Sequence, residues 1–255
     1  MKLNNLIVIS SLFILVFASC KKETSLDTGT NGGGGTGNTT ASRPKTYTED
    51  VTDANGHLAV TFNITYDASK RVTGLVSQTD PGTKFVYSYS SSSLFKMDIF
   101  DAGTLSIHEE FYLNSNGQPD STFQYNDTGD STTEKYIYNP AKQLTLLKNY
   151  IYTKAAGSVF DFATAYQYDS NGNVSKETDG FTVTTFDYTS IANPLINLSP
   201  FTITYPKLVK TTTISSGGVT TVLNHTYTFD SSNRLTSEKI ADNGNTIVVI
   251  KSYTY

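Results

Sequence analysis

The chain has 255 residues, of which 16% are charged, with a formal net charge of −4 and a single cysteine. This mild acidic balance, without a basic cluster, argues against a nucleic acid partner. The length is enough for one folded domain with its own core after a leader and a linker.

The first 19 residues have the pattern of a secretory leader. Lys2 precedes an apolar run from Leu6 to Phe17, which is too short for a transmembrane helix, and two small residues then lead into Cys20. This ending resembles the lipobox of bacterial lipoproteins, although Phe17 stands where the lipobox usually has Leu. The resemblance implies that Cys20 is acylated and anchors the protein in a membrane. An ordinary leader followed by an unrelated cysteine is the alternative. Acylation would leave no thiol for disulfides, catalysis or metal binding.

Residues 20–46 are predicted to form a lipidated flexible tether. The run 31–37 is almost all glycine and lies among Thr, Ser and Asn, so the segment cannot bury enough apolar surface to fold. Its root-mean-square reach is about 25 to 30 Å. Lys21 and Lys22 differ from the Asp that retains some lipoproteins in the inner membrane. The resemblance therefore implies an outer-membrane lipoprotein, facing either the cell surface or the periplasm.

Residues 47–255 are predicted to form a single domain built from a repeated hairpin. Each copy has aromatic or β-branched residues two apart, then Asp or Asn, then small residues, then an apolar residue. The copies are Ile64–Val72, Phe111–Gln118, Tyr136–Leu144, Tyr166–Glu177 and Tyr227–Leu235, with a weaker one from Tyr87. Residues i and i+2 of a strand share a face, and Asp, Asn and Gly favour tight turns. Turn residues recur every 23 to 30 positions or so, the spacing of a repeated supersecondary unit.

These copies resemble the YD-repeat (RHS-like) family, whose units read Tyr-x-Tyr-Asp-x-x-Gly-Arg-Leu. Tyr166–Val174 and Tyr227–Leu235 match best, with Asn173 at the Arg position and Asn233 at the Gly position. The resemblance covers about residues 58–255, and extends to repeat-bearing lipoproteins of Gram-negative bacteria. It implies an all-β fold of serial hairpins and implies no catalytic residues.

The predicted fold class is all-β, with some 14 to 17 antiparallel strands in a meander of hairpins. We expect a long twisted sheet that curls to hide its aromatic face, with a closed barrel or a sandwich as alternatives. A barrel that itself spans the membrane is disfavoured by the lipidated tether. Residues 189–206 contain three prolines and interrupt the repeat, so they are expected to form an irregular loop.

Aromatic pairs at i and i+2 are the most conspicuous candidates for a binding surface. We interpret them mainly as an aromatic ladder that builds the core, and alternatively as a platform on which sugar rings stack. The possible glycan or partner surface comprises Tyr136, Tyr138, Tyr150, Tyr152, Tyr166, Tyr168, Leu195 and Ile196.

Catalytic and metal sites find little support. The Asp53, Asp169 and Asp242 turns resemble calcium loops but lack the closing Glu, and hairpin turns explain them. The acid pairs Asp98/Asp101 and Glu109/Glu110 are the candidates for a hydrolase. We expect no cofactor, no metal site and a monomer.

The sequence therefore predicts a non-enzymatic, membrane-anchored lipoprotein of the cell envelope that acts as a scaffold or protein-interaction module. A glycan-binding surface lipoprotein in nutrient capture is the alternative, and a hydrolase is the second alternative. Buried tyrosines with an apolar patch elsewhere would favour a protein partner, whereas exposed coplanar tyrosines would favour a glycan.

Overall fold

A computed structural model describes residues 43–126, 131–153, 157–194 and 205–255. The predicted leader, Cys20, nearly all of the tether, Leu195 and Ile196 lie outside the described residues. Within the described ranges, no helix has the length and hydropathy needed to cross a membrane.

The described residues form sixteen strands, which pair into one continuous wall. Their bounds are β1 Thr46–Asp53, β2 Gly56–Tyr66, β3 Val72–Ser77, β4 Lys84–Tyr89, β5 Leu94–Asp101, β6 Thr104–Leu113, β7 Pro119–Asn126, β8 Ser131–Tyr138, β9 Leu144–Thr153, β10 Gly157–Tyr168, β11 Val174–Asp179, β12 Thr182–Ala192, β13 Lys207–Ser216, β14 Val219–Phe229, β15 Leu235–Asp242 and β16 Val248–Thr254.

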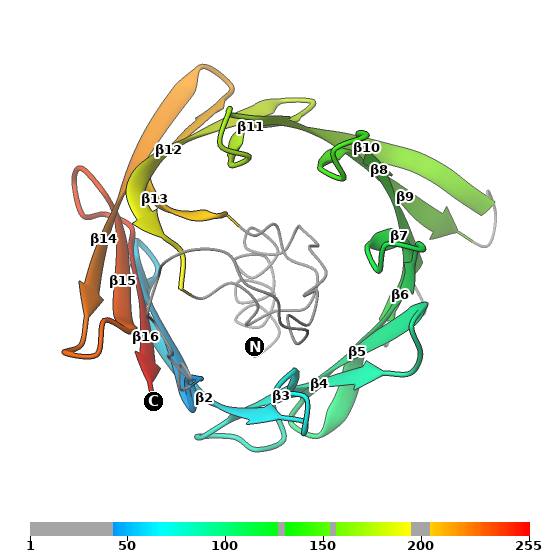
Figure 1. The fold of residues 1–255 in the computed structure, drawn as a ribbon, viewed down its shortest axis with the longest axis horizontal. Coiled ribbons are helices and arrows are strands. Elements are labelled where there is room, and N and C mark those ends of the chain that lie inside the picture. Colours follow the sequence, from blue (N-terminus) through cyan, green and yellow to red (C-terminus); the bar gives the residue numbers. More distant parts are fainter. Residues whose placement is uncertain (1–42, 127–130, 154–156, 195–204) are drawn as a thin grey trace, which may run out of the picture.

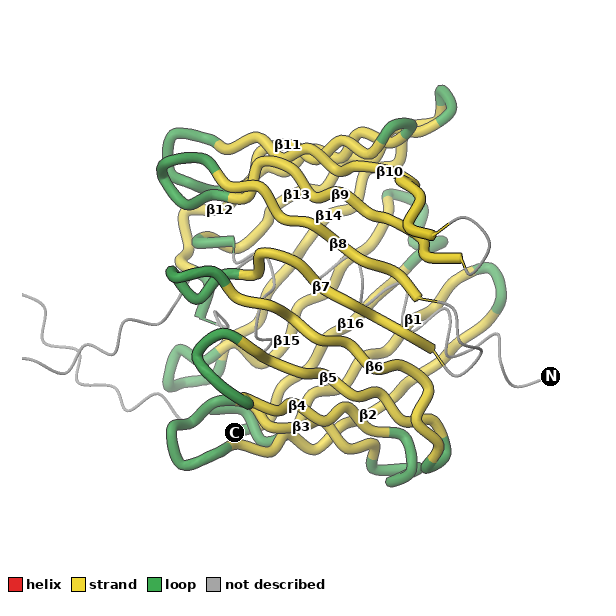
Figure 2. The backbone as a smooth tube through the Cα atoms, turned by 90° about the vertical axis from the view of Figure 1, so that its right-hand side faces the viewer, coloured by secondary structure: helices red, strands yellow, loops and turns green. Residues whose placement is uncertain are grey.

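Each strand pairs antiparallel with its neighbours in sequence, and β1 pairs with β16 from Thr46↔Thr254 to Thr52↔Val248, which closes a barrel. Figure 1 shows this closed ring, and Figure 2 shows the tilted strands with turns gathered at its two ends. The predicted all-β meander is confirmed. The sheet closes instead of remaining open and curled, so the alternative of a closed barrel is the one observed. Among the strands that the structure describes, closure leaves no unpaired edge.

The inner face of the wall is identified by side chains that meet across an intervening strand. Phe62 of β2 and Phe85 of β4 have ring centroids 5.8 Å apart although β3 lies between them. Strands two apart are separated by about 9.6 Å, so such side chains converge only on the concave side of a wall. The registers then place the buried cluster on this inner face: Phe62, Ile64, Val72, Leu75, Phe85, Tyr87, Phe95, Ile99 and Phe111.

The repeat has a structural basis in a tyrosine that ties each two-strand unit together. In seven of the eight units, β1/β2 to β15/β16, a tyrosine hydroxyl on the second strand donates to a backbone carbonyl at or near the start of the first. We call these bonds tyrosine clasps: Tyr66 to Pro44, Tyr89 to Val72, Tyr138 to Pro119, Tyr168 to Leu144, Tyr188 to Val174, Tyr227 to Val209 and Tyr255 to Leu235, at 2.6 to 3.0 Å. In β5/β6, Leu113 ends the second strand.

Five of the turns that follow these units share one geometry. Asp169 illustrates it: its carboxylate accepts from the backbone N–H of Asn171 and Asn173, and Gly172 adopts a positive φ of 81°. The first residue is always Asp or Asn and bonds the backbone N–H of the fifth, in the turns that begin at Asp67, Asn114, Asn139, Asp169 and Asp230. The Asp or Asn of the repeat is thus a turn residue, as the sequence predicts.

The segment 189–206, predicted as an irregular loop, is partly strand. Thr189–Ala192 continue β12 past a bulge, and the backbone N–H of Asn193 donates to the carbonyl of Pro206. Tyr205 packs inward against Phe186, with centroids 5.4 Å apart. Residues 195–204 lie outside the described part.

Candidate functional site

Over β6 to β10 the barrel turns several aromatic side chains outward. Among the described residues, nine of the thirteen exposed large hydrophobic residues belong to these five strands, and the registers turn six of the nine outward, whereas Ile151, Val159 and Phe162 face the interior. We use the name aromatic strip for the outward-facing set that comprises Tyr112, Phe123, Tyr125, Tyr150, Tyr152 and Phe160. Five of these six residues are exposed to solvent, and their exposed fractions range from 37% for Phe123 to 54% for Phe160. Exposed apolar residues gathered in this way mark an interaction surface.

The outward direction of the aromatic strip follows from strand register. Phe111 points into the core and pairs with Thr122, so Thr122 points inward and Phe123 outward. The alternation continues with Gln124 inward and Tyr125 outward. On β9, Leu147 pairs with the inward-facing Tyr136, which turns Tyr150 and Tyr152 outward.

The aromatic rings of the strip contact one another within and between strands. Phe123 and Tyr125 on β7 lie 6.2 Å apart, and Tyr150 on β9 meets Phe160 on β10 edge to face at 5.8 Å. At the edge of the strip toward β6, the ring of His108 lies 4.8 Å from that of Tyr125. The strip therefore contains two pairs of rings in contact, one on β7 and one across β9 and β10.

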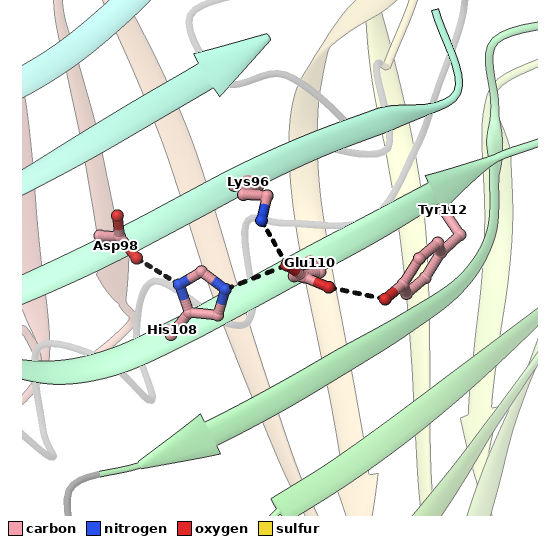
Figure 3. A network of polar contacts seen from close by, with 5 residues as sticks. All are labelled: Lys96, Asp98, His108, Glu110 and Tyr112. Atoms are coloured by element: carbon pink, nitrogen blue, oxygen red, sulfur yellow. Dashed lines mark hydrogen bonds and ion pairs between the residues drawn. The ribbon is translucent and has the colours of Figure 1, made fainter. Parts of the chain in front are cut away.

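A polar network borders the aromatic strip on β5 and β6 (Figure 3). His108 Nδ1 lies 2.5 Å from Asp98 Oδ1, and its Nε2 lies 3.4 Å from Glu110 Oε1. Lys96 Nζ and the Tyr112 hydroxyl both donate to Glu110 at 2.6 Å. These bonds, with Lys96 contributing most and Tyr112 next, lower the pKa of Glu110 to about 2. Glu110 is therefore a fixed anion that holds one border of the strip in place.

The inner wall behind the aromatic strip is polar and acidic. Glu134 on β8 accepts from the Tyr136 hydroxyl at 2.5 Å and from Thr122 at 3.5 Å. Burial, with a smaller contribution from the Glu134 charge, raises the pKa of Glu109 to about 8. Burial also raises the pKa of Glu134. Burial thus favours the neutral form of both carboxyl groups on the inner wall.

Other inward acids have matched partners. Burial would raise the pKa of Glu238, but Lys251 and His225 outweigh it and hold that pKa at about 2. His225 Nδ1 lies 2.9 Å from Glu238 Oε1. Burial raises the pKa of Glu177 to about 7, and the Tyr205 hydroxyl donates to this carboxyl at 3.4 Å. Among the described glutamates only Glu110 points outward, so five of these six glutamate side chains face the interior.

The predicted surface residues divide between the two faces. Tyr136, Tyr138, Tyr166 and Tyr168 point inward, and Tyr166 is only 8% exposed. Tyr150 and Tyr152 point outward and join the aromatic strip. The ladder interpretation therefore fits the first four, and they form no exposed platform. The prediction did not include Tyr112, Phe123, Tyr125 or Phe160 in the surface. The signal that could have identified the β7 pair is that its aromatic residues alternate with Thr122 and Gln124, a pattern that differs from that of the other repeats.

The candidate hydrolase pairs are split by the wall. Glu109 faces inward and Glu110 outward because neighbours on a strand face opposite sides. The carboxylates of the turns that resemble calcium loops cap backbone N–H groups: Asp53 bonds Asn55, and Asp242 bonds Ile247. These acids therefore act in turns and in the wall.

Comparison with known proteins gives likeness of fold alone. No protein family model matches the chain, and no characterised protein matches its sequence. A porin-like protein from Bacteroides uniformis has a similar structure, with a TM-score of 0.60 and 13% identity over 83% of this chain and 97% of that one. A porin-like protein from Bacteroides vulgatus is also similar, with a TM-score of 0.59 and 10% identity over 81% of this chain and 97% of that one. The chain thus shares the barrel architecture of porin-like proteins.

Proposed function

We propose that this protein is a non-enzymatic lipoprotein of the cell envelope that is anchored through Cys20 and binds a partner protein on its aromatic strip. The tether would carry the barrel clear of the lipid, and the strip would hold the partner against the side of the barrel. An outer-membrane location is supported by the lipobox resemblance and by the porin-like fold.

The outer face supports a barrel that stays out of the lipid. A membrane-spanning barrel has an apolar band outside and a polar interior. Here the large apolar cluster lies inside, while Lys84, Lys176, Asp187 and Lys239 point outward from the strands. Each lysine on the lipid side would cost about 2 to 4 kcal/mol at the bilayer midplane.

The observation that carries the proposed function is that the aromatic pairs on β7 and β9 face outward. The pairs on β4, β8 and β10 face inward, as Tyr87 and Tyr89 do, whereas Phe123 and Tyr125 on β7 face solvent. Tyr and Phe are enriched in protein interfaces. The buried tyrosines with an apolar patch elsewhere are the arrangement that favours a protein partner over a glycan.

The repeat unit supports a relationship to YD-repeat proteins, which we add to the proposal. The Arg position of the motif has a physical role here, because Arg71 lies 4.0 Å over the ring of Tyr89 and Arg234 lies 4.4 Å over the ring of Tyr255. Where Asn173 replaces Arg, its amide bonds the turn aspartate Asp169 at 2.8 Å, just as the guanidinium groups of Arg71 and Arg234 bond theirs. The Arg therefore packs on the tyrosine clasp of the following unit.

Site-specific photo-crosslinking in intact envelopes tests the proposed function. A photoreactive phenylalanine analogue would replace Phe123 or Tyr152 in the aromatic strip, and Thr213 or Thr226 on the opposite outer wall as matched controls. We expect a discrete, protease-sensitive adduct from the strip positions alone. Equal labelling from all four positions would contradict the proposal. An adduct that resists protease but is removed by glycosidases would favour the glycan-binding alternative.

A further inference from the structure

We propose that the partner docks an acidic segment on the barrel, with Asp or Glu carboxylates bound by Lys135 and Lys148 within the aromatic strip. This inference rests on the proposed function and names the chemistry of its partner. The site is on the outer face of β8 and β9, where each of the two strands contributes one lysine.

The two lysines stand directly opposite each other. Lys135 of β8 pairs with Lys148 of β9, and both side chains point outward because Glu134 and Leu147 beside them point inward. Directly opposed residues have Cβ atoms about 4.5 to 5.5 Å apart, and like charges at that separation destabilise a sheet. The barrel therefore carries a concentrated positive charge at this point, at a cost to its own stability.

The positions around the lysine pair supply no counter-charge. Lys135 faces Ser121 on β7, and Lys148 faces Ala163 on β10. Neither lysine forms an ion pair with any residue of the described chain, and the contact recorded for Lys135 is with the Tyr150 ring, 5.8 Å from Nζ to the centroid. An incoming anion would meet two ammonium groups that have no competing partner.

Two other lysines of the barrel form ion pairs with a glutamate. Lys96 on the strip border bonds Glu110 at 2.6 Å, and Lys251 inside lies 3.9 Å from Glu238. Each of these lysines faces a glutamate across the ladder, Glu110 on β6 and Glu238 on β15. In the opposed pair on β8 and β9, each lysine instead faces another lysine, on a wall that carries outward aromatic residues.

The surroundings favour a polypeptide as the source of the carboxylates. Ile137 and Leu146 pair on one side of the lysines, and Thr133 and Tyr150 pair on the other, so apolar contacts flank the charge. Such a surface suits a segment in which acidic and apolar side chains alternate. Because the closed barrel has no free strand edge, recognition must come from side chains and not from an added strand.

The experiment uses the full chain in its envelope, with the photoreactive analogue at Thr133 between the lysines and the aromatic rings. Adduct yield is compared in three backgrounds: Lys135→Ala with Lys148→Ala, Lys135→Glu with Lys148→Glu, and the matched control Lys176→Ala with Lys239→Ala. The control removes two outward lysines from β11 and β15. We expect a loss of at least about threefold for the alanine pair and tenfold for the glutamate pair, with no change in the control.

A second measurement identifies the chemistry with defined probes. Purified full chain is titrated with labelled poly-L-glutamate and with labelled polygalacturonate, which carries the same carboxylates on sugar. Preference for the polypeptide, lost in the glutamate pair, supports the inference. Preference for the polysaccharide overturns it, and so does an adduct that persists in the glutamate pair but disappears in Phe123→Ser with Tyr152→Ser. That last result would leave the proposed function intact, whereas the absence of adducts from every strip position would remove both.

Discussion

The β2 to β6 wall and the β7 to β10 wall of this barrel differ in the faces that their aromatic pairs take: the pair on β4 faces inward, whereas the second wall has outward pairs on β7 and β9 and inward pairs on β8 and β10. In the first wall Phe62, Phe85 and Phe95 point inward and are nearly inaccessible to solvent. In the second wall Phe123 and Phe160 point outward, while Glu134 lies on the inner face. Both walls consist of the same hairpin unit and share the tyrosine clasps. This difference indicates that the tyrosine clasp and the turn determine the fold of a unit, whereas the alternation along its strands determines which side chains the unit exposes.

The largest expected effect comes from truncating a buried aromatic ring in the first wall, which is compared with an exposed ring in the second wall. Phe95 is 1% exposed and its ring contacts those of Tyr87, Tyr89 and Phe111, so Phe95→Ala is expected to lower the free energy of unfolding by about 3 to 5 kcal/mol. Phe123→Ala is the matched control, with an expected loss below about 1 kcal/mol. Urea denaturation followed by circular dichroism measures both. Equal losses of stability in the two variants would contradict the proposed difference between the two walls.

The acidic inner face predicts a stability that falls as pH rises. The pKa of Glu109 is raised in the folded chain from its usual 4.5 to about 8, so its stabilisation is complete below about pH 4.5 and is lost through about pH 8. We expect a loss of about 2 to 3 kcal/mol across this window, roughly half the full value for such a shift because the site is partly hydrated. Melting curves from pH 5 to pH 9 check this. Glu109→Gln should flatten the profile, and an unchanged slope would refute the assignment to Glu109.

The tyrosine clasps are expected to contribute equally in both walls. Tyr168→Phe removes the bond to the Leu144 carbonyl and is expected to cost about 1 kcal/mol, because the buried carbonyl loses its donor. Tyr89→Phe in the first wall should cost the same, since it makes the same bond to Val72. Tyr152→Phe, which lies in the aromatic strip and makes no clasp, is the control with no expected change. Thermal unfolding of the three variants tests whether the same clasped unit builds both walls.

The smallest expected effect is a gain in stability. Lys148→Thr removes one of two opposed like charges and should raise the free energy of unfolding by about 0.2 to 1 kcal/mol at low salt. The gain should be smaller at high ionic strength, because salt already screens the repulsion between the two lysines. Lys239→Thr, opposite Thr226 and Ile250, is the control with no gain. A destabilised Lys148→Thr variant would show that the lysine pair serves the fold itself.

Much of the fold is readable in the sequence because the repeat is local. The Asp or Asn of each turn and the tyrosine before it lie within a few residues of each other, so Tyr168-Asp169 already predicts a hairpin end. Closure is not local: it depends on β1 meeting β16, more than 200 residues away. A meander of this length can curl or close, and only the sum of strand twists and staggers decides between them.

The site was harder to predict because it depends on which face each strand turns inward. The pairs Phe123/Tyr125 and Tyr136/Tyr138 have the same spacing, yet one faces solvent and the other the interior. A shift of one residue in register exchanges the two faces, and the sequence of a single strand does not contain the register. The opposed lysines are likewise 13 positions apart in the chain, and only the β8/β9 ladder brings them together.

The tyrosine clasps have a consequence for how such barrels change size over evolution. Each clasp joins the two strands of one unit, so the unit is complete before its neighbours are added. Because every unit enters and leaves the wall at the same rim, duplication or deletion of a unit inserts or removes two strands without breaking the antiparallel order. The circumference can therefore grow or shrink in steps of two strands, and units that carry an outward aromatic pair, such as β7/β8 and β9/β10, can be acquired as a block.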